Sequence, residues 1–239
     1  MNESPELLVE QLPRARRVLR VAMVTETYPP DVGDLALTAR RLAEGLRHRE
    51  HEIQLVRPRR DRRDTTSAAA RMQEILTLGM PLPRRRGLRV GLPAARPLAR
   101  LWSGSRPDVV YVLTQGPLGW SALRAARQLR LPAVSHFNTD FLGHCRGYSV
   151  AWLSRRIVAY LRKFHNRALW TLVPSEGLRA ELATLGFRNL RVAAGGADAA
   201  QWWDLRQIET LLEIAAGLGP ASYGASGERR TRTPIPQST

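Results

Sequence analysis

Short apolar runs alternate with amphipathic stretches along most of this chain. In the stretches, apolar side chains recur at the three- and four-residue spacing of a helix. The clearest unit has an apolar strand at 17–25, a glycine-bearing loop at 26–34, a helix at 35–49 and a second strand at 51–56. This order predicts a strand–loop–helix–strand unit of the kind that builds parallel sheets.

The same alternation continues as far as residue 199. The run Val109-Val110-Tyr111-Val112 is apolar on both faces, which is typical of a central parallel strand covered by helices on each side. We therefore expect an α/β fold, with a Rossmann-like parallel sheet, helices on both faces and right-handed crossovers. Further strands are expected at 75–78, 132–137, 169–173 and 190–193, and further helices at 94–102, 120–129, 148–169 and 176–185.

Ligands of such sheets bind at the carboxyl ends of the strands. The loops after Thr25, Thr114, Phe137 and Val173 are therefore the places where we expect chemistry.

The two ends of the chain lack this alternation. Residues 1–16 are polar and are expected to form a flexible N-terminus, and residues 17–199 form the predicted domain. Within residues 200–239, the segment 202–217 can form one helix, and the Gly-, Ser-, Thr-, Pro- and Arg-rich remainder predicts a disordered tail. The loss of amphipathic order after Asp198 resembles the effect of a frameshift.

The formal net charge is +16, and Lys163 is the only lysine among the basic residues. Two interpretations of this excess remain open: arginine-biased codon usage, and a surface that attracts phosphate-bearing partners. The arginine-rich stretch 57–70 is expected to be a solvated loop. The helix at 148–169 has an apolar and a basic set of side chains, which fits either a core-packed helix with a solvated basic face or a helix resting on an anionic membrane.

Cys145 is the only cysteine, which excludes an intrachain disulfide and fits a reducing cytoplasm. The N-terminal residues show no apolar run of signal-peptide length, and no segment approaches the roughly 20 apolar residues of a membrane span. We expect a cytoplasmic protein that can lie on the inner face of the plasma membrane. His144, Cys145 and His165 match no usual metal-site spacing, so no metal is expected.

Several short sequences occur in a characteristic order. They are VTETYPP at 24–30, LTARRLAEGL at 37–46, PDVVYV at 107–112, GPLGW at 116–120 and LGFRNLRV at 185–192. Together they resemble the amino-terminal, acceptor-side domain of the retaining glycosyltransferases of family 4, above all bacterial GDP-mannose-dependent α-mannosyltransferases. The resemblance covers about residues 17–198 and implies one half of a GT-B architecture, with the second domain missing.

The resemblance implies hexosyl transfer, most readily of mannose from GDP-mannose, onto a glycolipid or another glycan acceptor, without a metal or other cofactor. It implies that Gly33 and Asp34 lie in the loop on the diphosphate side of the donor. Asn138 stands where the family has a histidine beside the sugar, and Gly116, Thr139 and Asp140 are expected to line the acceptor cleft. The family's pair of glutamates eight positions apart in the second domain has no counterpart after residue 198.

Three functions remain open at this point. The first is a truncated glycosyltransferase that is inactive, or nearly so, alone. The second is a non-catalytic acceptor-binding subunit that pairs with a separate donor-binding chain. The third, a nucleic-acid binder, is disfavoured because aromatic residues make up only 6% of the chain and no groove-reading motif occurs.

Overall fold

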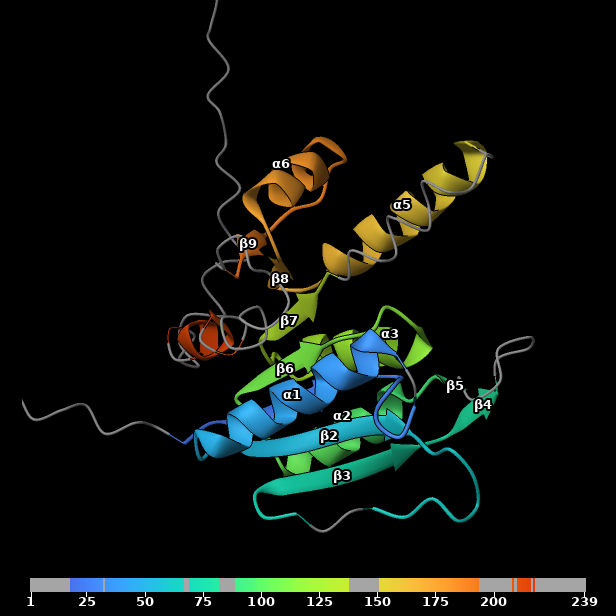
Figure 1. Ribbon diagram of the computed structural model, residues 1–239, viewed down its shortest axis with the longest axis vertical. Helices are drawn as coiled ribbons and strands as arrows, with labels where there is room; N and C mark the ends of the chain where they lie inside the picture. Colours follow the sequence, from blue (N-terminus) through green and yellow to red (C-terminus); the bar gives the residue numbers. More distant parts are fainter. Residues whose placement is uncertain are drawn as a thin grey trace, which may run out of the picture.

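The computed structural model describes residues 18–31, 33–66, 69–81, 89–137, 151–193, 208, 210–215 and 217. Helices and strands alternate over most of these residues, as the sequence predicts (Figure 1). The strands are β1 (Arg20–Val24), β2 (Glu52–Pro58), β3 (Met72–Thr77), β4 (Gly79–Pro81), β5 (Arg89–Gly91), β6 (Val109–Val112), β7 (Ala133–His136), β8 (Trp170–Val173) and β9 (Leu190–Val192). The helices are α1 (Asp34–His48), α2 (Ala95–Gly104), α3 (Pro117–Gln128), α5 (Ala151–His165) and α6 (Glu176–Thr184).

Seven strands form one sheet in the order β3-β2-β1-β6-β7-β8-β9. Every neighbouring pair in it is parallel, which confirms the predicted α/β class and parallel sheet. The antiparallel pair β4–β5 was not expected. Its two strands are three residues each and partly exposed, too short to show a period in the sequence.

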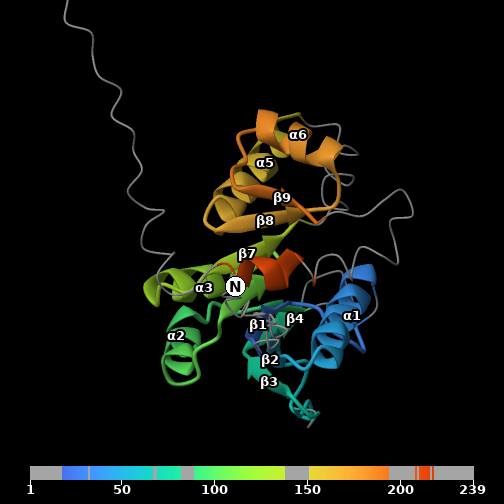
Figure 2. The same cartoon turned by 90° about the vertical axis from the view of Figure 1, so that its left-hand side faces the viewer.

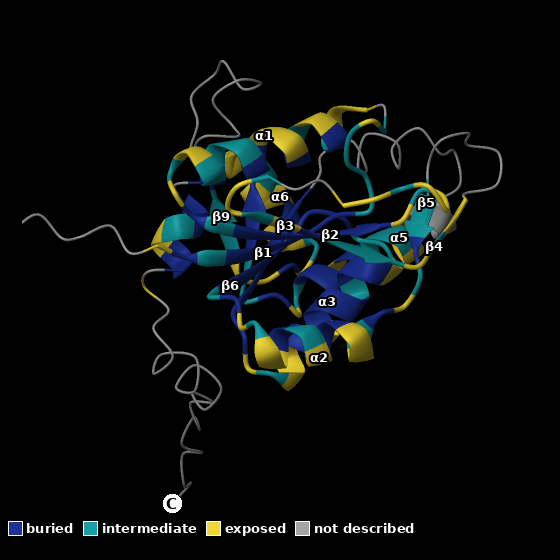
Figure 3. Ribbon diagram, turned by 90° about the horizontal axis from the view of Figure 1, so that it is seen from below, coloured by how far each residue is buried: buried dark blue, intermediate teal, exposed yellow. Residues whose placement is uncertain are grey.

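Helices cover both faces of the sheet, as expected. Figure 2 shows α1 on one side of the central strands and α2 and α3 on the other. Alternate side chains of β1 divide between the two resulting cores: Val21 and Met23 pack with α1, whereas Ala22 and Val24 pack with α2 and α3. Seen from below, the strands form a buried layer between helices whose outer faces are exposed (Figure 3).

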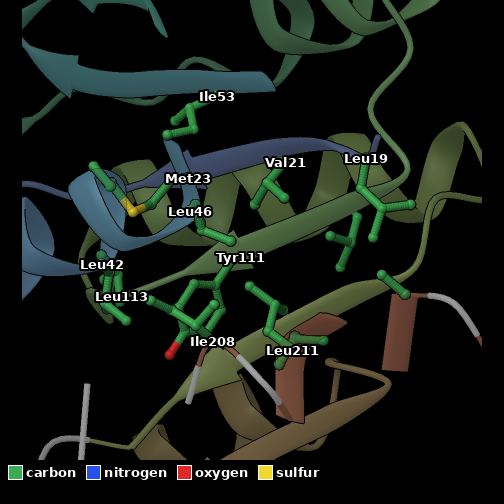
Figure 4. Close-up of a cluster of buried hydrophobic side chains, with 14 of the residues drawn as sticks. Leu19, Val21, Met23, Leu42, Leu46, Ile53, Tyr111, Leu113, Ile208 and Leu211 are labelled. Carbon is green, nitrogen blue, oxygen red and sulfur yellow. The ribbon is translucent and has the colours of Figure 1, made fainter. Parts of the chain in front are cut away.

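The described helical residues between 208 and 217 extend the α1 side of the core. Ile208, Leu211 and Ile214 are buried in the same cluster as β1, β2 and β6 (Figure 4). Gly45 of α1 makes room for this helix, since a Cβ there would lie 2.4 Å from Cδ1 of Ile208. The helix expected within 202–217 is thus present in this part of the chain and packs on the sheet.

One side of α5 faces the core. Leu161 and Phe164 are buried, while Arg155, Arg156 and Lys163 are exposed. The core packing expected for the predicted helix at 148–169 is thus present, and contact of its basic face with an anionic membrane stays a prediction.

His165, at the end of α5, is buried in the core. Its Nδ1 lies 2.9 Å from Oγ of Ser135, which in turn lies 2.9 Å from Oγ1 of Thr171. Burial lowers the pKa of His165 to about 3, so the ring is neutral. This hydrogen-bonded group joins α5 to β7 and β8 within the core.

Arg57 corrects the expectation that the arginine-rich stretch is solvated. Its side chain is only 4% exposed and donates to both carboxylate oxygens of Asp64, at 2.7 and 3.0 Å. It also donates to Oε2 of Glu74 on β3, at 2.8 Å from Nη2. The sequence pattern missed this site because charge alone does not reveal that two carboxylates converge on one guanidinium. Arg59, Arg62 and Arg63 are exposed, as predicted.

We expect Arg57→Met to destabilise the fold strongly, because it leaves the carboxylates of Asp64 and Glu74 buried without their cation. The loss should be about 3–5 kcal/mol of unfolding free energy in urea denaturation. Arg63→Met, in the loop that follows β2, removes an exposed arginine and should change stability by less than about 0.5 kcal/mol. Equal effects of the two substitutions would contradict the assigned role of Arg57.

Candidate functional site

The sheet changes its winding direction between β1 and β6. The chain leaves β1 for α1 on one face, and leaves β6 for α3 on the other. Two connections that diverge from adjacent parallel strands leave a crevice at their carboxyl ends, where ligands of such sheets bind. The loops that follow Thr25 and Thr114, both expected from the sequence to carry chemistry, border this switch point.

Glu26 bridges the two loops. Its backbone N–H donates to Oγ1 of Thr114 (3.0 Å), and its Oε1 accepts the backbone N–H of Leu118 (3.0 Å). Leu118 lies in the first turn of α3, where backbone N–H groups lack partners within the helix. A side chain from the end of β1 therefore caps the helix that follows β6.

Gly116 is required by this bridge. A Cβ at Gly116 would lie 2.1 Å from Oε1 of Glu26 and 2.2 Å from Oε2. The backbone of Gly116 is extended (φ −81°), so space rather than conformation calls for glycine here. The structure thus brings Gly116, a predicted acceptor-cleft residue, into contact with a carboxyl group that the sequence analysis did not select.

Burial raises the pKa of Glu26 to about 7, although the hydrogen bond from Leu118 acts in the opposite direction. The carboxyl group therefore exists in both protonation states near neutral pH. A raised pKa of a carboxyl group at the carboxyl ends of parallel strands is typical of functional sites. The sequence signal for this residue was its place directly after the first strand, but only the fold reveals its helix contact and burial.

Gly33 and Asp34 lie at the start of α1, across the end of β1. Gly33 has φ +143°, a conformation that favours glycine, and its carbonyl accepts the N–H groups of Ala36 and Leu37. An added Cβ would meet nothing within 4 Å, so the surface beside Gly33 is open. Asp34 places a carboxylate in the first turn, where it complements the positive end of the helix dipole.

The buried cluster around Arg57 also holds the β1–α1 loop. Asp64, bonded to Arg57, accepts the backbone N–H of Arg60 at 2.8 Å. The Arg60 side chain then donates to the carbonyl of Pro29 at 3.0 Å. Hydrogen bonds from Arg57 and Arg60 lower the pKa of Asp64 to about 2, so this carboxylate stays charged at neutral pH. The loop beside the crevice is thereby fixed to β2.

An aromatic pair lies beside the β6–α3 connection. Tyr160 of α5 donates its hydroxyl to the carbonyl of Gln115 (2.5 Å) and accepts the indole N–H of Trp120 (2.8 Å). The Tyr160 side chain is 42% exposed. Gln115 donates to the carbonyl of His136 (3.1 Å), so the ends of β6 and β7 are joined beside these rings.

Three predicted site residues, Asn138, Thr139 and Asp140, lie outside the described residues, just after the end of β7. Within the described part of the chain, no group of three His, Cys, Asp or Glu side chains is arranged to hold a metal. In that same part, no helix is both long and apolar enough to cross a bilayer.

The sequence profile of Glycosyltransferase Family 4 matches residues 35–201. This match covers well over half of the chain. The chain belongs to Glycosyltransferase Family 4. The resemblance inferred from the ordered motifs is thus confirmed, and the parallel sheet is the Rossmann-like half of a GT-B fold.

Two relatives in this family are bacterial proteins described as GDP-mannose-dependent α-mannosyltransferases. The one from Mycolicibacterium smegmatis is 32% identical over 69% of this chain and 44% of its own length. The one from Mycobacterium tuberculosis is 29% identical over 81% of this chain and 51% of its own length. The chain therefore spans about half the length of these family 4 relatives.

A solved structure of sucrose-phosphate synthase from Thermosynechococcus elongatus has the same fold. It superposes with a TM-score of 0.53 at 12% identity, covering 82% of this chain and 98% of the solved one. At this identity the likeness concerns the fold alone.

We expect Gly116→Ala to destabilise the protein by about 1–3 kcal/mol, because the new methyl group forces the Glu26 carboxyl away from the α3 N-terminus. Gly104→Ala is the matched control, since a Cβ at Gly104, the last residue of α2, meets nothing within 4 Å. It should be neutral or stabilise by up to about 1 kcal/mol.

A double-mutant cycle with Glu26→Ala identifies the cause. If Glu26 is the obstacle, Gly116→Ala should cost much less in the Glu26→Ala background. A cost that is equal in both backgrounds would refute this explanation.

Proposed function

We propose that this chain is the acceptor-side half of a retaining glycosyltransferase, which transfers mannose from GDP-mannose to a lipid-linked or other glycan acceptor. The observation that carries the proposal is the identity of 32% and 29% to two GDP-mannose-dependent α-mannosyltransferases over most of the chain. The crevice at the β1–β6 switch point is the acceptor side, and a donor-binding half closes over it.

The charged groups at the switch point support the proposal that this half binds the acceptor and the other half binds the donor. Transfer of a sugar from a nucleotide diphosphate needs cations or helix N-termini that stabilise the departing diphosphate. In the described residues, the α1 and α3 N-termini at the crevice carry Asp34 and Glu26 instead. The stabilising groups therefore come from the donor-binding half, while this half binds the acceptor and orients it.

We propose that Asn138 lowers the rate of sugar transfer. An asparagine hydrogen-bonds but neither carries charge nor transfers a proton, unlike the histidine that the family has there. Thr139 and Asp140 follow it in sequence and complete the proposed acceptor cleft with Gly116. Gly33 remains the proposed contact to the diphosphate side, because its open surface lets a ligand approach the backbone.

The test uses the donor-binding half of the M. smegmatis relative, supplied as a separate chain or fused to this one. With GDP-mannose and a glycolipid acceptor, we expect no transfer by this chain alone and α-linked mannosyl product from the fusion. Asn138→His in the fusion should raise the rate by about tenfold or more, as restored transition-state contacts do. Product formation is followed with radiolabelled GDP-mannose.

Three results would count against this function. They are transfer by this chain alone, a folded fusion without mannosyl transfer, and a fusion that uses another nucleotide sugar but not GDP-mannose. The relative's own two halves, rejoined by the same linker, provide the positive control.

We further propose that the surface at the carboxyl end of β3 contacts an anionic membrane, which would bring the protein close to a lipid-linked acceptor. Leu78 follows β3 and is 74% exposed, and Met80 on β4 is 52% exposed. The exposed Arg59 adjoins them, because its backbone N–H donates to the carbonyl of Thr77. Apolar side chains beside arginines are the combination that binds anionic lipid surfaces.

We expect Leu78→Glu/Met80→Glu to weaken binding to vesicles containing phosphatidylglycerol by about tenfold, measured by cosedimentation. Val18→Glu is the control, because Val18 is 48% exposed but precedes β1, at the amino ends of the strands. Equal effects of both changes, or equal binding of the wild-type chain to neutral vesicles, would contradict the proposed surface.

A further inference from the structure

We propose that a groove between α5 and the end of α6 binds a phosphate monoester attached to an apolar body. Both helices lie at the end of the molecule that carries β8 and β9 (Figure 1). The strand order β1-β6-β7-β8-β9 separates this end from the switch point. The groove is therefore a second site, and the inference does not depend on the proposed function.

The groove is large enough for a small molecule. Its volume is about 580 Å³, which lies within the usual range of ligand sites. Residues 184–186, at the end of α6, form one wall. The other wall is one face of α5, where the lining side chains recur at three- and four-residue spacing: Arg155, Val158, Ala159 and Arg162.

Arg162 is held in place by the end of α6. Its Nη1 donates to the carbonyl of Leu185 at 3.1 Å. Gly186 permits this approach, because its φ of +82° favours glycine and an added Cβ would lie 3.2 Å from Cδ of Arg162. Asn166, just after α5, donates to the carbonyl of Gly186 at 3.1 Å. The guanidinium is thus positioned in the groove before a ligand arrives.

The two arginines of the groove bring charge without a carboxylate to balance it. No acidic side chain lines the groove. Within the described part of the chain, neither Arg155 nor Arg162 forms an ion pair, whereas Arg179 on the same α6 pairs with Glu176. A guanidinium has five N–H donors, and the bond to Leu185 uses one of those on Arg162.

The protein groups around the groove do not supply the missing acceptors. The carbonyl of Ala183 accepts the N–H of Gly186, at 3.0 Å. The next two exposed carbonyls, of Leu185 and Gly186, accept from Arg162 and Asn166. The remaining donors therefore need acceptor oxygens from a bound molecule.

A phosphate monoester meets this need better than a carboxylate. Arg155 and Arg162 are seven residues apart, about 10 Å along the helix axis, so their long side chains can converge on one group between them. A phosphate monoester carries about −1.5 to −2 charges at pH 7 and three terminal oxygens, enough to accept from both guanidiniums. A carboxylate offers one charge and two oxygens.

The apolar part of the groove defines the rest of the ligand. Val158 and Leu185 are partly buried and lie on opposite walls, and Ala159 adds a small side chain. An apolar chain or ring attached to the phosphate can cover these side chains, which removes apolar surface from water. A lipid phosphate and a soluble phosphate ester share this chemistry.

The experiment measures binding of inorganic phosphate and hexyl phosphate to the full chain by isothermal titration calorimetry. We expect hexyl phosphate to bind about tenfold more tightly than inorganic phosphate, because its chain covers the apolar walls. Arg155→Gln and Arg162→Gln should each weaken binding of hexyl phosphate by about fivefold or more. Ala159→Trp fills the groove and should remove the advantage of the hexyl chain.

Arg100→Gln is the matched control, because Arg100 is an exposed arginine of α2 and does not line the groove. It changes the net charge equally and should alter affinity by less than about twofold. Arg162→Gln also removes the bond to Leu185, so its folding is checked by thermal unfolding. Arg155 has no contact of this kind within the described residues, and Arg155→Gln decides the outcome if Arg162→Gln does not fold.

Vesicles that contain phosphatidic acid distinguish the two sources of the phosphate. A loss of cosedimentation in Arg155→Gln, relative to Arg100→Gln, would identify a lipid phosphate. Unchanged cosedimentation with weakened binding of hexyl phosphate would identify a soluble ester.

Three results would overturn the proposal. They are no binding of hexyl phosphate, equal affinities of Arg155→Gln and Arg100→Gln, and binding of hexanoate as tight as that of hexyl phosphate. The last result would show a groove for carboxylates, such as those of an acidic protein segment. The mannosyl-transfer assay is independent of all three, since neither outcome of that assay changes the expected binding of phosphate.

Discussion

In β1 and β6, side chains on both faces of the strands are fully buried, so water reaches neither face of the sheet at its centre. A parallel sheet of this kind needs helices on both sides. Coverage of both faces requires the crossover helices to go to opposite sides somewhere in the strand order. In this protein the change occurs between β1 and β6, and the crevice, the Glu26 bridge and the space requirement at Gly116 all follow from it.

The charge at the switch point differs in sign from the net charge of the chain. The chain carries a formal charge of +16, yet the described helix N-termini at the switch point carry Asp34 and Glu26. Arg57 is buried and holds Asp64 and Glu74, so it contributes to the fold rather than to ligand attraction. The exposed Arg59 adjoins the apolar side chains after β3, and Arg62 and Arg63 are exposed in the loop after β2. Positive charge therefore belongs to other parts of the described surface than the two helix N-termini at the switch point.

The buried guanidinium also explains how the loop at the crevice is kept in place. Arg57, Asp64 and Arg60 form a continuous series of hydrogen bonds from β2 to the carbonyl of Pro29. A buried ion pair of this type adds little net stability over an apolar replacement but is costly to break. Its effect here is positional, since the loop that carries Glu26 cannot shift without disturbing a buried charge.

The sequence by itself determined the class of fold and most element positions, because apolar periodicity directly reflects which faces are buried. The α1 and β6 elements, at Asp34–His48 and Val109–Val112, agree with the expected ranges within a residue or two. The ordered motifs also identified the family. These features depend on local pattern, which a single sequence contains.

Tertiary structure alone decided the rest. The burial of Arg57, the capping of α3 by Glu26 and the packing of Ile208 on Gly45 each join residues far apart in the chain. No local pattern marks such pairs, because the sequence around a residue is the same whether or not that residue contacts another one far away in the chain. The chemistry of the switch point was therefore settled by strand order and by desolvation, and both arise only when the sheet is assembled.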